Sequence, residues 1–141
     1  MPEHLFSGDG FLKKDINVHI KKLGLTDVIK VEKMLDGDEK FKTFARSRLF
    51  ISAAHYDSGN LSLDEAMACG TPGIVYDIPL LYYPRGVIKI SCFDKFLFAK
   101  AIISLLSNKL ARDKLSHKAL NFGETLDWKK SAKNALLSLL V

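Results

Sequence analysis

Apolar residues in the first half of the chain alternate between short continuous runs and helical spacing. The short runs predict strands at Leu5–Phe6, Val28–Val31 and Leu49–Ile51. Between them, apolar residues recur every three or four positions, which predicts helices over 11–23 and 41–45. An order of strand, helix, strand, helix, strand is typical of an α/β protein.

The second half continues this alternation and then becomes wholly helical. A polar loop, Ala53–Asn60, leads into a short helix over Leu61–Cys69, which Gly70 and Pro72 end. Two further buried strands follow, at Gly73–Tyr76 and Val87–Ile90. The remaining apolar spacing predicts three helices: Phe96–Ser107, Ala111–Asn121 and Trp128–Leu140.

Alternating strands and helices predict a doubly wound, Rossmann-like parallel sheet of about five strands with C-terminal helices. We expect the whole chain, 1–141, to form a single domain. Ligands of such sheets bind at the carboxyl ends of the strands. Two polar loops leave such ends, Ser7–Gly10 and Ala53–Asn60, and they are the candidate binding loops.

Composition and charge exclude several classes of protein. The chain has 141 residues, of which 48% are hydrophobic, too many for a disordered segment. Neither a membrane span nor a signal peptide is expected, so the predicted compartment is the cytoplasm, with peripheral membrane contact left open. Cys69 and Cys92 have no metal-ligand spacing, and we expect free thiols and no metal site.

The net charge of +5 is concentrated at the C-terminal end, where residues 94–141 carry nine Lys and Arg against four Asp and Glu. Most of the excess is lysine on helical repeats, without interleaved arginine and aromatic residues, so no nucleic-acid partner is expected. In the last helix, Lys129, Lys130 and Lys133 lie opposite an apolar stripe. We expect that stripe to pack on the domain rather than on a bilayer.

The candidate chemistry is concentrated between Asp57 and Pro72. A Gly-containing loop that leads into a helix leaves unpaired N–H groups around Gly59–Ser62, where the helix dipole also favours phosphate. Glu65 could accept hydrogen bonds from a ribose diol, and Asp57 from a second ring. Alternatively, Glu65 only complements the helix dipole and Asp57 only caps a turn.

This segment resembles the signature of retaining GT-B glycosyltransferases of family four. In that signature an acid, seven residues and Glu-Ala-Met-Ala-x-Gly-x-Pro bind a nucleotide-sugar donor, and Asp57, Glu65, Gly70 and Pro72 stand at matching positions. The Gly8-Asp9-Gly10 turn also resembles the family's Gly-rich turn after an earlier strand. The similarity extends over roughly 5–140.

The resemblance implies a donor-binding half that holds a nucleotide-diphosphate sugar. Glu65 would hold the ribose, Asp57 the sugar hydroxyls, and the amides of 59–62 the diphosphate. The loop at 31–34 would face the base. The donor-binding residues implied are Gly8, Gly10, Asp57, Ser58, Gly59, Asn60, Leu61, Ser62 and Glu65. No catalytic residue is assigned, and no cofactor is expected because the nucleotide sugar is the substrate.

The chain also departs from the family pattern. The first acid is Asp57 instead of Glu, and the loop reads Ser58-Gly59-Asn60 where the family has Gly-aromatic-Gly. A strand and helix that supply an Arg and a Lys to the diphosphate would precede Leu5. If the sheet closes without that strand, the expected order is 2-1-3-4-5; otherwise a strand from another molecule fills the gap.

Three functions therefore remain open at this point. The first is the donor-binding half of a glycosyltransferase that transfers the sugar to an unidentified acceptor. The second is a non-catalytic nucleotide-sugar-binding subunit that needs an acceptor-binding partner chain or a second copy of itself. The third is a basic module that docks on an anionic surface.

Overall fold

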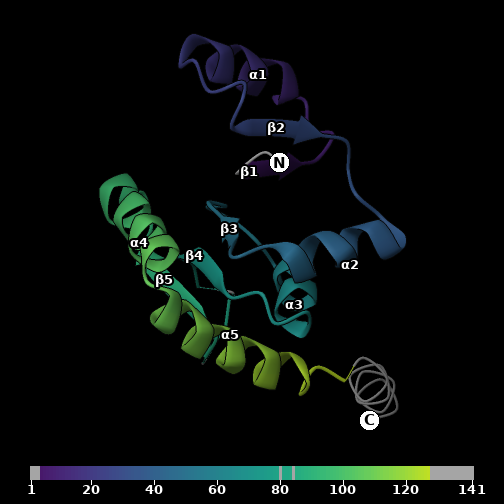
Figure 1. Cartoon of the computed structure of the whole chain (residues 1–141), viewed down its shortest axis with the longest axis vertical. Coiled ribbons are helices and arrows are strands. Elements are labelled where there is room, and N and C mark those ends of the chain that lie inside the picture. Colours follow the sequence, from purple (N-terminus) through teal and green to yellow (C-terminus); the bar gives the residue numbers. More distant parts are fainter. Residues whose placement is uncertain (1–3, 80, 84, 128–141) are drawn as a thin grey trace. The chain divides into compact units, whose positions relative to one another are not determined.

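The structure is a computed structural model that describes residues 4–79, 81–83 and 85–127 (Figure 1). The chain divides into two compact units, Met1–Lys40 and Phe41–Val141. The helix predicted over Trp128–Leu140, with Lys129, Lys130 and Lys133, lies outside the described residues. The expectation of a single domain stays a prediction.

The first unit is a strand, helix, strand motif. Strands β1 (His4–Ser7) and β2 (Ile29–Glu32) pair in parallel, and helix α1 (Lys13–Lys22) connects them. Ile20 is the buried residue of α1, and 7% of its surface is exposed. These elements confirm the predicted strand, Gly-rich turn, helix and strand within two residues of the predicted bounds.

Helix α2 (Gly37–Arg46) follows, and the second unit contains a three-stranded parallel sheet in the order β3-β4-β5. Its strands are β3 (Phe50–Ser52), β4 (Gly73–Asp77) and β5 (Val87–Ser91). Because β4 is central, its residues Gly73–Tyr76 are buried, as a continuous apolar run predicts. Helix α3 (Leu61–Ala68) joins β3 to β4.

Two long helices complete the second unit, α4 (Lys95–Ser107) and α5 (Lys109–Gly123). The backbone of α5 passes very close to Gly86, which precedes β5. A Cβ added to Gly86 would lie only 2.5 Å from the Cα of Ala119. A Cβ on Gly123 would lie 2.5 Å from the Cα of Ala68 in the same way. Figure 1 shows α5 running past α3.

The parallel α/β class is confirmed, but the five-strand order 2-1-3-4-5 is not. The ladders give β1-β2 in one sheet and β3-β4-β5 in another, and none among the described strands joins β1 to β3. The order within each sheet agrees with the prediction. The apolar pattern of a segment identifies it as a strand but carries no information about which strand pairs with its free edge.

Candidate functional site

The predicted donor-binding residues lie in both units. Gly8 and Gly10 belong to the first unit, and the residues between Asp57 and Glu65 belong to the second. Within the second unit, the chain from the end of β3 to the middle of α3 brings these residues together at the carboxyl end of the sheet.

The Gly-rich turn of the first unit is tied to the loop that follows β2. The Asp9 carboxylate accepts the Met34 N–H at 3.0 Å and the Lys13 Nζ at 3.0 Å, and together these bonds hold its pKa below the usual range. A Cβ on Gly8 or Gly10 would meet nothing within 4 Å. The fold of this unit therefore needs no glycine there, and the bare backbone remains open to a ligand.

In the second unit, Asp57 organises the candidate loop. Its Oδ1 accepts the N–H of Gly59 at 3.1 Å and that of Asn60 at 2.8 Å, which is an Asx turn. Two of the four amides that were expected to meet a diphosphate are therefore already engaged. The turn-capping role considered for Asp57 is present in the structure.

Asn60 begins α3 and is itself buried. Its Oδ1 accepts the Leu63 N–H at 3.2 Å, an N-cap interaction, and the residue is only 7% exposed. Its side-chain Nδ2 has no hydrogen-bond partner among the described residues. A buried donor without an acceptor costs roughly 1–3 kcal/mol, so the start of α3 holds a polar group that the fold does not satisfy.

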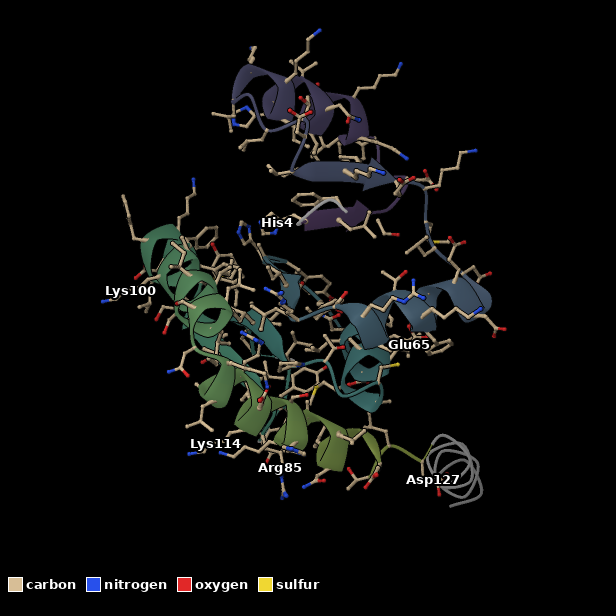
Figure 2. All side chains as sticks on the ribbon, in the orientation of Figure 1. His4, Glu65, Arg85, Lys100, Lys114 and Asp127 are labelled. Carbon is tan, nitrogen blue, oxygen red and sulfur yellow. The ribbon has the colours of Figure 1, made fainter. Side chains whose placement is uncertain are left out.

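The first turn of α3 presents two more donors. No acceptor in the described chain takes the N–H of Leu61 or Ser62, which are the first two residues of the helix. Glu65, which is labelled in Figure 2, follows Leu61 by four positions and Ser62 by three. This spacing places all three residues on the same helix face. The helix start thus offers amide donors beside a half-buried carboxylate.

A pair that the sequence analysis missed lies under this turn. The hydroxyl of Tyr83, from the loop between β4 and β5, hydrogen-bonds the Asp64 carboxylate. Burial raises the pKa of Asp64 despite this bond, with a further contribution from the charge of Glu65. Burial and the two nearby carboxylates, Asp64 and Asp57, raise the pKa of Tyr83, which stays protonated and donates.

An Asp64→Asn variant is expected to be more stable than the native chain at neutral pH. The folded-state pKa of Asp64 is raised, so the folded chain binds a proton more tightly than the unfolded chain. Its contribution to stability is therefore lost as pH rises from about 4 through the raised pKa. Urea midpoints at pH 4 and pH 7 check this, and an equal difference between variant and native chain at both pH values would contradict it.

Aromatic side chains line the same end of the sheet. The His55 ring, just after β3, lies 4.2 Å between centroids from Phe93 and 5.5 Å from Tyr76. Phe93 has a φ of 69°, which is unusual for a residue with a large side chain, and it is 65% exposed. His55 therefore packs against two aromatic rings, each in a tilted arrangement.

Comparison with known families decides the assignment. The sequence model of the family described as Glycosyl transferases group 1 matches residues 4–122. The chain belongs to this family. No curated protein sequence matches it.

Several solved structures share the fold of this member of the Glycosyl transferases group 1 family. Sucrose-phosphate synthase from Thermosynechococcus elongatus is 20% identical, with a TM-score of 0.85 over 98% of this chain and 38% of that one. TarM of S. aureus is 20% identical, with a TM-score of 0.81 over 94% and 28%. Anabaena HepE in complex with UDP-glucose is 16% identical, with a TM-score of 0.82 over 96% and 40%.

These findings confirm the resemblance to GT-B glycosyltransferases at the level of family and fold. The chain spans 28–40% of the length of those three structures. Within the described ranges, no group of three His, Cys, Asp or Glu side chains could hold a metal ion. No helix in those ranges has the length and apolar character needed to cross a membrane.

Proposed function

We propose that this chain binds the nucleotide-diphosphate sugar of a glycosyltransferase at the start of α3. The observation that carries the proposal is the pair of N–H groups at Leu61 and Ser62, which have no acceptor in the described chain and share a face with Glu65. Anions bind at helix N-termini because these donors and the helix dipole point at them. Structures of TarM and HepE with UDP support a nucleotide as the ligand class.

The chemistry assigned to each residue follows from its position. The Leu61 and Ser62 amides would stabilise the charge that develops on the departing diphosphate, and such preorganised donors commonly make a large contribution to catalysis. Glu65 would accept the ribose hydroxyls. Asp57 would mainly hold the loop in shape, because its Oδ1 already accepts two backbone N–H groups.

The reaction proposed is transfer of the sugar to an acceptor, with the nucleotide sugar as substrate and no separate cofactor. The acceptor would be bound by a further part of the same polypeptide or by another chain, which includes a second copy of this one. The cytoplasm is the proposed compartment, because the expected substrate of this chain is a nucleotide sugar. Membrane contact is not required for donor binding.

Calorimetric titration of the chain with UDP, GDP and ADP tests the proposal. One of these nucleotides is expected to bind, and Glu65→Gln is expected to weaken its binding by about tenfold, since a charged acceptor to the ribose is lost. Glu124→Gln, at the end of α5, removes the same charge away from the loop and is expected to leave the affinity unchanged.

Two results would contradict the proposal. The first is no binding of any of the three nucleotides at millimolar concentration. The second is an equal loss of affinity in Glu65→Gln and Glu124→Gln, which would indicate a general charge effect and return Glu65 to a dipole-complementing role.

A further inference from the structure

A second concave region lies at the opposite end of the sheet. A hollow of about 390 Å³ is lined by residues that precede β3 and β4, by the turn after α3, and by one face of α5. Arg48 stands two residues before β3, and Pro72 immediately before β4. The candidate donor loop leaves the carboxyl end of β3, so this hollow at the amino ends is a different place on the same unit.

The charges that line the hollow are predominantly positive. Arg48 and Arg112 both contribute, and no acid among the described residues pairs with Arg48. The one lining carboxylate, Asp113, already forms an ion pair with Lys109. Asp113 also interacts with the charge of Arg112, so among the described residues Arg48 is the lining arginine that has no acid partner, and the two arginines outnumber the one carboxylate.

Arg112 is fixed in position with donors to spare. Its Nη1 donates to the carbonyl of Leu105 at 2.8 Å and to that of Leu106 at 3.0 Å, at the end of α4. Both bonds use one nitrogen, whereas a guanidinium group has five N–H donors. An arginine held in this way loses little side-chain entropy when it binds an anion, and its planar donors suit phosphate oxygens.

The end of α3 works against an anion here, but its effect is smaller. A helix C-terminus carries about half a negative charge, and α3 ends at the wall of the hollow. The carbonyls at this end are largely satisfied, because those of Ala66 and Met67 accept the N–H groups of Thr71 and Gly70, each at 2.9 Å. Burial raises the pKa of the Cys69 thiol, which therefore adds no negative charge. The two arginines outweigh what remains.

The size and walls of the hollow narrow the ligand class. A volume of about 390 Å³ is in the range of small-molecule sites and exceeds what a phosphate ion alone would fill. Ala45, Pro72 and Leu120 add apolar wall beside the arginines, and His117 adds a further polar group. We infer that this hollow is a binding site for a phosphate monoester carried on a small organic body.

The inference is independent of the donor site and extends beyond it. Lys114 also belongs to α5 (Figure 2) but does not line the hollow. A dianionic phosphate group could accept hydrogen bonds from both arginines and would neutralise the positive excess of the lining.

Amide chemical shifts of the full 141-residue chain, titrated with glucose 6-phosphate and separately with inorganic phosphate, test the inference. Glucose 6-phosphate is expected to cause saturable shifts in residues 45–48, 69–72 and 112–120, with a midpoint at or below about 1 mM. Arg48→Ala is expected to raise that midpoint about tenfold because a charged hydrogen bond is lost. Inorganic phosphate is expected to bind more weakly.

Arg46→Ala is the matched control, since Arg46 carries the same charge, stands two positions before Arg48 and does not line the hollow. It is expected to leave the midpoint within about twofold. Equal effects of the two variants, equal binding of both probes, no saturation, or shifts confined to residues 57–62 would each overturn the inference. UDP binding to Arg48→Ala is expected to be unchanged, which separates this test from that of the donor site.

Discussion

A Gly86→Ala variant is expected to lose about 3 kcal/mol of unfolding free energy, from two costs that add. Gly86 has a φ of 79°, a left-handed conformation that residues with a Cβ rarely adopt. The added Cβ would also lie 2.5 Å from the Cα and 2.7 Å from the N of Ala119. Since these are backbone atoms of α5, the helix itself would have to move.

Gly70→Ala separates the two costs. Its φ of 80° is nearly the same, but its Cβ would meet only the Ser116 Oγ, at an ordinary 3.8 Å. The expected loss is therefore about 1–2 kcal/mol, the conformational part alone. Urea denaturation of both variants and the native chain measures the difference. Equal losses would show that the approach of α5 to Gly86 does not determine stability.

A Leu63→Ala variant is expected to lose about 3 kcal/mol of unfolding free energy. Leu63 lies in the first turn of α3 with no exposed surface, and it packs so closely on β4 that a Cβ on Gly73 would lie 2.5 Å from its Cδ1. Truncation removes apolar contacts and leaves a cavity that this tightly packed layer fills poorly. Thermal or urea denaturation measures the loss.

Leu61→Ala is the control for this prediction. Leu61 is in the same turn but is 54% exposed, and its truncation is expected to change stability by no more than about 0.5 kcal/mol. A similar loss in both variants would mean that the helix is stabilised by its own propensity instead of by the core. A larger loss in Leu63→Ala than in Leu61→Ala would show that the packing of its buried face holds α3 in place.

The elements were predictable because their local signals agree with their tertiary surroundings. The run Gly73–Tyr76 is apolar throughout, and the structure buries it as the central strand. Gly70 was expected to end α3, and its φ of 80° with the Thr71 N–H bonded to the Ala66 carbonyl is the Schellman geometry. The pairing of β1 was not predictable to the same degree, because pairing joins residues distant in sequence.

The candidate site was predictable in place but not in detail. The loop and helix start were located from Asp57 to Glu65, because glycine, polar residues and an apolar helix follow one another there. The sequence could not show that the Oδ1 of Asp57 accepts two backbone N–H groups, because these bonds depend on the local backbone geometry. It also missed Tyr83, since the bond to Asp64 joins residues 19 positions apart through a loop without periodicity.

The burial of α3 has a thermodynamic consequence for whatever binds at its start. Leu63, Ala66 and Met67 have no exposed surface, so the core holds this eight-residue helix from below and fixes the directions of its first N–H groups. A ligand that arrives there has no backbone to order. The entropy of arranging the donors was lost once, when the chain folded, and a short helix that would be unstable in isolation becomes a rigid receptor.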